Sequence, residues 1–265
     1  MTQATNTSKP ILSVNNVAVH FGGLVAISDM TFDLKAGELV SLIGPNGAGK
    51  TTAFNVVTGF MRPTKGDVLF HGESLTHLKP HQVAQRGLVR TFQRTSLFSN
   101  DTVFDNVRTG LHRHGSASTW ATMLALPSMR REEKKLQDAV WEVLDFVGIG
   151  HRANELAGSL PYGEQRLLGV AIALAADATV LLLDEPAAGM NASETAEFMA
   201  LLAKIRKRDI SILLVEHDMP LVMGVSDRIV VLNYGKIIAN GTPAEIQGNP
   251  EVIQAYLGQG VKQHA

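Results

Sequence analysis

A glycine-rich stretch beginning at Gly44 constrains the fold of this chain more than any other segment. It reads G-x-x-x-x-G-K-T, the pattern of a phosphate-binding loop. The apolar run Leu39–Ile43 before it predicts a buried strand, and residues 50–58 after it predict a helix. Strand, glycine-rich loop and helix form the order that this pattern requires. The residues expected to bind nucleotide phosphates are Gly44, Pro45, Asn46, Gly47, Ala48, Gly49, Lys50, Thr51 and Thr52.

The chemistry of such a loop follows from its backbone. Glycines let the chain approach an anion closely, and successive N–H groups converge on its oxygens. The N-terminus of the following helix adds a partial positive charge. We expect Lys50 to reach the β- and γ-phosphates and the Thr51 hydroxyl to bind Mg²⁺. A tight glycine turn before an ordinary helix is the structural alternative, but it gives no reason for the Lys-Thr pair.

Composition limits the remaining possibilities. The 265 residues are 45% hydrophobic, enough for a large core, and the net charge of −1 gives no indication of a nucleic-acid partner. The absence of cysteine excludes a disulfide framework, a thiolate zinc site and a cysteine nucleophile. No apolar run is long enough to span a membrane, and the first ten residues lack a secretory-signal pattern. We therefore expect a disordered start over residues 1–10 and a soluble, cytoplasmic protein.

Two adjacent carboxylates end a second apolar run. Residues 179–183 predict a buried strand, and Asp184 and Glu185 follow it. Carboxylates at the carboxyl end of a parallel strand lie in the ligand crevice. We expect Asp184 to hold Mg²⁺, directly or through water, and Glu185 to orient and polarise an attacking water. The alternative, an acidic pair in solvent, is disfavoured by the phosphate loop in the same chain.

Four further places carry candidate residues, and the first two of these have two interpretations each. Phe21 either stacks on a purine base or packs as a core or turn aromatic. Gln93, at the end of an apolar run from Leu88, either contacts the metal or the water, or is an ordinary loop residue. His217 ends the run 211–215 at the same predicted sheet edge and could hydrogen-bond a γ-phosphate. Residues 160–166 precede a predicted helix over 167–176, whose N-terminus offers a second place for an anion.

Together these motifs resemble the ATP-binding cassette of an ABC transporter over residues 11–258. The resemblance implies an α/β, P-loop NTPase fold with a RecA-like core, an antiparallel β subdomain and a helical subdomain. It implies a core with the β subdomain over 11–93 and 159–240, and a helical subdomain over 94–158. C-terminal helices over 241–258 and a tail over 259–265 would follow.

The resemblance also implies roles for single residues. Phe21 takes the adenine-stacking position, Gln93 senses the metal and water, Glu185 is the catalytic glutamate, and His217 is the switch histidine. Mg²⁺ would then be held by Thr51, Gln93 and Asp184, with ATP and Mg²⁺ as the bound cofactors. A signature segment would contact the ATP of a second cassette through Leu160, Pro161, Tyr162, Gly163, Glu164 and Gln165.

Two departures from the common pattern narrow the resemblance. Pro161 replaces the usual serine of the signature, and Asn191 stands where an aspartate is usual. The segments that contain these two residues, together with residues 215–219 and 240–243, resemble the ATPases of bacterial importers for branched-chain, hydrophobic amino acids. The implied partners are a second ATPase subunit in a hetero- or homodimer, two transmembrane permeases and, indirectly, a periplasmic or surface substrate-binding protein. The implied location is the cytoplasmic face of the inner membrane, as a peripheral subunit.

Other transporter types and other classes remain as alternatives. Urea or amide importers and lipopolysaccharide-export ATPases are close relatives of the resembled group, and this subunit does not read the substrate. A non-transport ABC ATPase would be expected to carry a long coiled-coil insertion or a second cassette, and the sequence shows neither. A kinase with a phosphate loop would lack a signature segment ahead of the acidic strand.

Overall fold

The computed structural model describes residues 9–91, 97–111 and 127–260 of the 265-residue chain. The described strands form one ten-stranded sheet in the order β5-β4-β1-β2-β10-β9-β3-β8-β7-β6. The strands are β1 (Leu12–Phe21), β2 (Leu24–Leu34), β3 (Leu39–Ile43), β4 (Lys65–Phe70), β5 (Glu73–Ser74), β6 (Leu88–Arg90), β7 (Val180–Asp184), β8 (Ser211–Val215), β9 (Arg228–Asn233) and β10 (Lys236–Gly241). The α-helices are α1 (Lys50–Val57), α2 (Pro80–Gln85), α3 (Val103–Leu111), α5 (Pro127–Val147), α6 (Tyr162–Ala175), α7 (Ala192–Arg206), α8 (Met219–Val225), α9 (Pro243–Gln247) and α10 (Pro250–Gly260).

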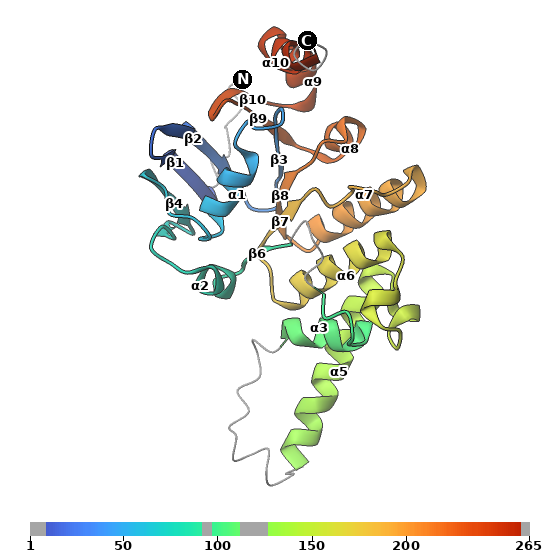
Figure 1. The fold of residues 1–265 in the computed structure, drawn as a ribbon. Helices are drawn as coiled ribbons and strands as arrows, with labels where there is room; N and C mark the ends of the chain where they lie inside the picture. Colours follow the sequence, from blue (N-terminus) through green and yellow to red (C-terminus); the bar gives the residue numbers. More distant parts are fainter. Residues whose placement is uncertain (1–8, 92–96, 112–126, 261–265) are drawn as a thin grey trace, which may run out of the picture.

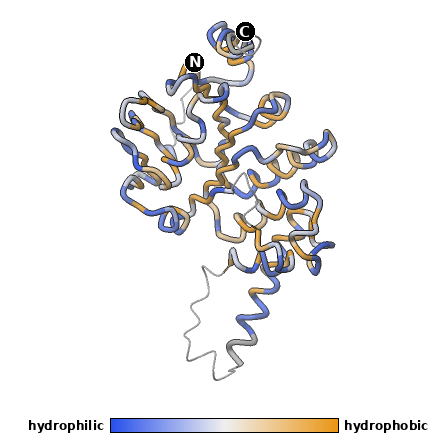
Figure 2. Tube along the Cα trace, in the orientation of Figure 1, coloured by the Kyte–Doolittle hydropathy of each residue, from blue (hydrophilic) through white to orange (hydrophobic). Residues whose placement is uncertain are grey.

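The centre of the sheet is parallel and buried. β3 pairs in parallel with β8 and β9, and β7 lies in parallel between β8 and β6. Every residue of β3, β7 and β8 is buried, as expected for strands covered on both faces. Figure 2 shows these central strands as the most hydrophobic part of the trace. Their carboxyl ends therefore meet at one edge of the sheet. The phosphate loop follows β3 at this edge, Glu185 follows β7, and His217 lies just after β8.

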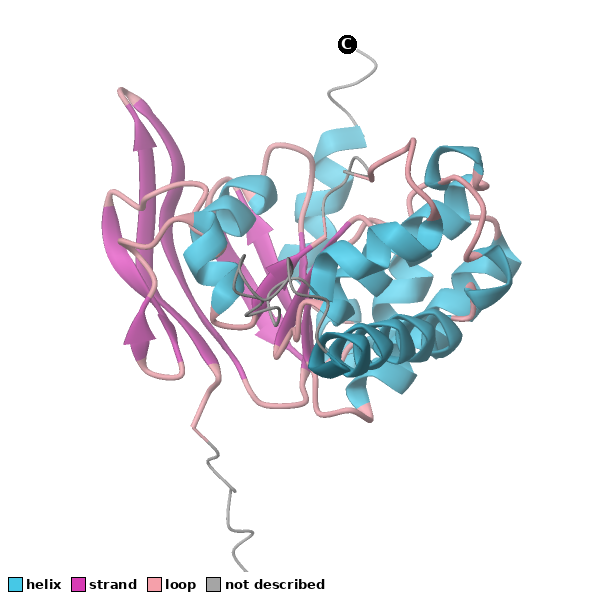
Figure 3. Cartoon of the chain, turned by 90° about the horizontal axis from the view of Figure 1, so that it is seen from below, coloured by secondary structure: helices cyan, strands magenta, loops and turns pink. Residues whose placement is uncertain are grey.

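Alternate residues of these strands face two different cores. Leu181 and Leu183 pack with Phe198 of α7 and with the helices α3, α5 and α6. Leu182, between them, packs on the other face with Phe54 of α1. This alternation is the period-two geometry of a strand, and it fixes which helices cover which face. Figures 1 and 3 show the helical part and the antiparallel strands on opposite sides of the centre.

The antiparallel part lies beside the parallel centre. β1 pairs antiparallel with β2 and β4, and β4 pairs antiparallel with β5. It joins the parallel part through a parallel contact of β2 with β10, at the register pair Asp29–Lys236. On the far side, α3, α5 and α6 pack against one another. In the described part of the chain, no helix is both long and apolar enough to cross a membrane.

Most predicted elements lie within a few residues of the observed ones, with two corrections. The strand expected over 88–93 ends at Arg90. The helix expected from Leu167 begins at Tyr162, so residues 162–166 form its first turns instead of a loop. The cause is Pro161, whose extended backbone (ψ 150°) occupies the N-cap and directs the chain into the helix. Asn191 caps the start of α7, because its side chain accepts from the amides of Ser193 and Glu194.

A half-buried ion pair joins the start of β3 to the start of β9. The Arg228 guanidinium donates to both carboxylate oxygens of Glu38, at 2.8 and 3.1 Å, and to the Asp33 carbonyl at 2.6 Å. Burial opposes the charge of Glu38, but the hydrogen bonds and charge of Arg228 outweigh it and lower the pKa of that carboxyl. The pair fixes the register of the strands at the edge opposite the phosphate loop.

Replacing Glu38 tests this pair through the pH dependence of stability. A carboxyl with a lowered pKa stabilises the fold above its unfolded value of 4.5, and this contribution is lost as the pH falls through the folded-state pKa. We expect Glu38→Gln to lower the free energy of unfolding by about 1–3 kcal/mol at pH 7, with a shrinking difference from wild type below about pH 4.5. Urea unfolding at several pH values measures this. Glu73→Gln, in an exposed pair with Arg86, is the matched control and should change little. An equal loss at all pH values would contradict the assignment.

Candidate functional site

The loop after β3 is closed by backbone contacts that only glycine allows. A side chain on Gly44 would collide with the backbone oxygen of Leu232 in β9. Gly49 has a φ of 108°, which L side chains rarely adopt, and it immediately precedes α1. The loop is therefore held against β9 while its last residue turns the chain into the helix. This is the geometry expected of a phosphate-binding loop.

Lys50, the first residue of α1, turns back into this loop. Its ammonium donates to the carbonyls of Gly44 and Pro45, at 2.7 and 3.1 Å, and the residue is 7% exposed. Burial lowers the pKa of Lys50, while the nearby charges of Glu185 and Asp184 act in the opposite direction. The ammonium thus lies inside the loop, within electrostatic reach of both strand-end carboxylates.

A cavity of about 390 Å³ opens over the loop. Its lining brings together predicted site residues from three distant parts of the chain, with additional residues from β2 and the β9–β10 turn. The lining residues are Leu24, Val25, Ala26, Asn46, Gly47, Ala48, Gly49, Lys50, Thr51, Thr52, Glu185, His217 and Tyr234. The cavity is cationic at Lys50 and rimmed by apolar and aromatic side chains, as a site for a phosphate-bearing ligand with a planar base requires.

Glu185 and His217 form a hydrogen-bonded pair at the mouth of this cavity. His217 Nε2 lies 2.8 Å from Glu185 Oε1, and both side chains are partly exposed. The two residues come from the ends of the neighbouring strands β7 and β8, and the Glu185 amide donates to the Val215 carbonyl at 2.8 Å. Glu185 has a φ of 49°, a strained value for a non-glycine residue of the kind that functional sites retain. The pair presents a fixed carboxylate and an imidazole to whatever occupies the cavity.

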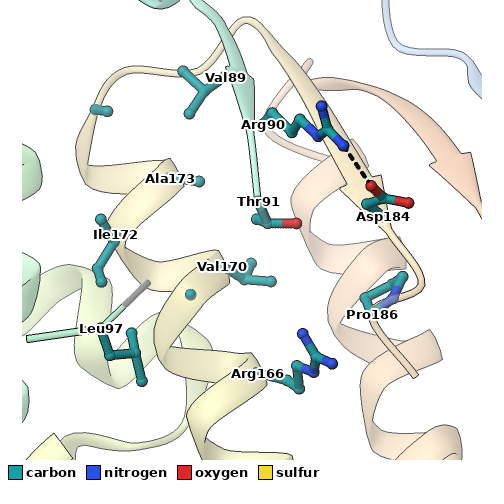
Figure 4. A pocket seen from close by; sticks show the side chains of 12 residues that line it. Val89, Arg90, Thr91, Leu97, Arg166, Val170, Ile172, Ala173, Asp184 and Pro186 are labelled. Carbon is teal, nitrogen blue, oxygen red and sulfur yellow. Dashed lines mark hydrogen bonds and ion pairs between the residues drawn. The ribbon is translucent and has the colours of Figure 1, made fainter. Parts of the chain in front are cut away.

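Asp184 faces the other way. It is 4% exposed and receives a 2.6 Å hydrogen bond from Arg90 Nη2. It lines a second, smaller cavity of about 190 Å³ together with Arg90 and Arg166 (Figure 4). The buried carboxylate therefore already has a cationic partner on this side.

The donor set suits the expected magnesium ion. Thr51 and Asp184 offer a hydroxyl and a carboxylate, the oxygen ligands that Mg²⁺ prefers, and Thr51 lines the cavity over the loop. Asp184 acts electrostatically on Lys50, so its charge is felt at the loop. The third predicted ligand, Gln93, lies outside the described residues.

Two predicted regions stand apart from this cavity. Phe21, at the end of β1, is 47% exposed and is absent from the lining as far as the described residues show, whereas Tyr234 is present. Residues Leu160 to Gln165 are also absent from the described lining. Gln165 instead donates to the Leu160 carbonyl at 2.9 Å, and Glu164 pairs with Arg152 at 3.0 Å. One chain thus gathers the loop and the strand-end residues but not the signature segment.

Glu216 is a functional candidate that the sequence reasoning missed. The residue is 4% exposed and precedes His217. One of its oxygens accepts from the Ala187 amide at 2.7 Å, and the other accepts from the His217 amide at 2.8 Å. Glu216 therefore ties the segment after Glu185 to the histidine. A charged residue closing an apolar run was the available signal, because a buried carboxylate requires such partners.

Glu216→Gln tests this tie. The amide group of glutamine cannot accept at both positions, so one buried N–H loses its partner at a cost of about 1–3 kcal/mol. We expect a loss of that size in urea unfolding at pH 7, and a larger effect on nucleotide turnover than on nucleotide affinity. Glu197→Gln, at an exposed position on α7, is the matched control. Unchanged stability and turnover would show that Glu216 does not hold the two segments.

This chain is similar to known proteins both in sequence and in fold. The family model described as ABC transporter matches residues 27–188, and the model described as branched-chain amino acid ATP-binding cassette transporter matches residues 236–262. The chain is 46% identical to the high-affinity branched-chain amino acid transport ATP-binding protein LivG of Escherichia coli strain K12, over 95% of this chain and 99% of that protein. It is 44% identical to BraF of Pseudomonas aeruginosa, described in the same words, with the same coverage. Among solved structures, the ADP conformation of MJ1267, an ATP-binding cassette of an ABC transporter, matches with a TM-score of 0.82 and 27% identity over 95% of this chain and 100% of that one.

The chain therefore belongs to the ABC transporter family, as one of its ATP-binding cassettes. Within that family it is homologous to the ATP-binding subunits of the branched-chain amino acid group. The resemblance inferred from the sequence is confirmed, and so is the predicted α/β fold class of the cassette.

Proposed function

We propose that this chain binds and hydrolyses ATP and thereby powers an importer for branched-chain or other hydrophobic amino acids. The observation that carries the hydrolytic part is the meeting of Lys50 and Thr51 with the Glu185–His217 pair in one cavity. The substrate class is supported by the similarity to LivG and BraF. Urea and amide importers remain the alternative within the family.

The residues divide the chemistry among themselves. Lys50 exchanges its carbonyl partners for the β- and γ-phosphates and offsets their charge, while the loop amides bind the remaining oxygens. Thr51 and Asp184, with Gln93, would hold Mg²⁺, which when bound neutralises charge between the β- and γ-phosphates. Tyr234 and the exposed Phe21 are the aromatic candidates for contact with the adenine.

Glu185 is the group placed to handle the attacking water. Its carboxylate accepts a hydrogen bond from the water and takes its proton as the oxygen attacks the γ-phosphorus. His217 holds the Glu185 carboxylate at 2.8 Å and so fixes its direction. The bond to the β-phosphate oxygen breaks in line with the attack, and ADP and inorganic phosphate leave.

A second cassette would complete the site. The signature residues lie away from the cavity, at the N-terminus of α6, where in the described structure no side chain caps the first amides after Pro161. Those amides and the partial charge of a 14-residue helix replace the missing serine hydroxyl as the means of contacting a partner's γ-phosphate. In this proposal two cassettes face each other, bind two permeases at the cytoplasmic face of the membrane, and act on a substrate-binding protein only through those permeases.

Glu185→Gln separates binding from hydrolysis. Glutamine keeps the shape of the side chain but cannot take the proton, so we expect ATP affinity within about twofold of wild type and turnover reduced by at least about a hundredfold. Fluorescent-nucleotide binding and phosphate release measure the two quantities. Lys50→Ala, which removes the phosphate-binding ammonium, should instead abolish most binding. Wild-type turnover in Glu185→Gln would assign the base elsewhere.

The transport role is tested on the assembled complex. The tagged chain, purified in detergent from the membranes of its own organism, should bring down two permeases and a second ATPase, identified by mass spectrometry. In proteoliposomes, ATP hydrolysis should rise severalfold when the substrate-binding protein carries leucine, isoleucine or valine, because closure is coupled to substrate delivery. Stimulation by urea or an amide in place of these amino acids would assign the substrate to the alternative class.

A further inference from the structure

We propose that Arg90 is a built-in counter-ion for Asp184, which keeps this carboxylate neutralised until nucleotide and Mg²⁺ arrive. The inference rests on the nucleotide-binding function proposed above. Its consequence is that Arg90 sets how strongly nucleotide binding depends on Mg²⁺. Arg90 is thus a positioning residue, acting through Asp184 and not on the phosphates.

The contact is short and sheltered from water. Arg90 Nη2 lies 2.6 Å from Asp184 Oδ2, and the two side chains are 9% and 4% exposed. The residues end the neighbouring parallel strands β6 and β7, where Arg90 stands in register with Leu182. Figure 4 shows the guanidinium reaching across to one oxygen of Asp184 while the other oxygen points away from it. One oxygen is thereby engaged, and the other stays available to a second cation.

Arg90 is held in this position by α1, whose first turn carries the phosphate-binding residues, and by Phe60 in the segment after it. Its Nη1 donates to Asn55 Oδ1 of α1 at 2.8 Å. Its guanidinium carbon lies 5.6 Å from the ring centre of Phe54 and 5.9 Å from that of Phe60, within the range of cation–π contact. These contacts are independent of Asp184, so the cation is already positioned when the carboxylate needs it.

The ion pair between Arg90 and Asp184 changes how the phosphate loop attracts a nucleotide. A buried carboxylate without a partner carries a large desolvation cost. Burial lowers the pKa of Lys50, and the charge of Asp184 is close enough to oppose that lowering. Without Arg90, the bare charge of Asp184 would act on the same loop that receives the phosphates and would repel them. With Arg90 present, the guanidinium offsets part of that repulsion before any metal binds.

The decisive quantity is the ratio of two dissociation constants for a fluorescent ADP analogue, measured in EDTA and in excess Mg²⁺. The full-length chain is compared with R90Q, with the double variant R90Q/D184N, and with R86Q as the matched control. Arg86 is an exposed arginine that pairs with Glu73 at 2.8 Å and touches no predicted site residue among those described. Thermal unfolding of each variant accompanies the binding data.

We expect R90Q to raise the EDTA-to-Mg²⁺ ratio about tenfold, mainly through weaker binding in EDTA, because a uniform loss of structure would weaken both constants alike. R86Q should leave the ratio unchanged. R90Q/D184N, in which the pair is neutral and of similar shape, should bind the analogue in EDTA within about twofold of wild type, because no uncompensated charge remains.

The outcomes separate the possibilities. An unchanged ratio in R90Q overturns the proposal, and so does a double variant whose binding in EDTA is far weaker than wild type, since Arg90 would then bind the phosphates itself. If R90Q does not fold, the double variant still decides by the same measurement. If the wild-type chain binds no analogue in either condition, the proposed nucleotide-binding function is wrong, and the role of Arg90 that rests on it is wrong as well.

Discussion

The parallel register of β3, β8 and β7 is the constraint on which the candidate site depends. Asp184 stands opposite Val215, and Ser41 opposite Leu214, so the three strands end together at one edge of the sheet. Because side chains alternate along a strand, a slip of one residue would exchange the faces of Leu181 and Leu182 and, beyond them, the surroundings of Asp184 and Glu185. The two hydrophobic cores, one on each face of the sheet, resist such a slip. Packing far from the cavity therefore fixes its chemistry.

Neighbouring carboxylates lie in different surroundings because of this alternation. Asp184 is buried against Arg90, whereas Glu185 reaches the cavity and meets His217. A buried carboxylate that is already paired suits a metal ligand whose charge must be controlled, and a partly exposed one suits proton transfer with water. The two environments come from consecutive residues at one strand end, and the strained φ of Glu185 marks the point at which the chain turns from one to the other.

The sequence predicted those parts of the site that are local and missed those that depend on register. The phosphate loop and the strand-end carboxylates follow from contiguous residues with a direct chemical reason for each position. Arg90 and Glu216 act through partners 94 and 29 residues away. No spacing rule predicts such partners, because they meet only after the strands have paired. The predicted start of α6 at residue 167 is wrong because the helix begins at Tyr162, and Gly163 lies in its first turn after Pro161.

The same strand register connects the cavity to the segment at the start of α6, which lies outside the cavity. Glu216 holds the amides of His217 and Ala187, and Gly189, two residues further on, lies so close to the Tyr162 ring that a Cβ there would be 3.0 Å from Cε1. Tyr162 begins α6, the helix whose N-terminus would face a second cassette. A continuous run of packed and hydrogen-bonded groups therefore connects the histidine over the phosphate loop with the proposed partner surface. Glu216, which is buried and has both carboxylate oxygens engaged, stands in the middle of this run and holds its two segments together.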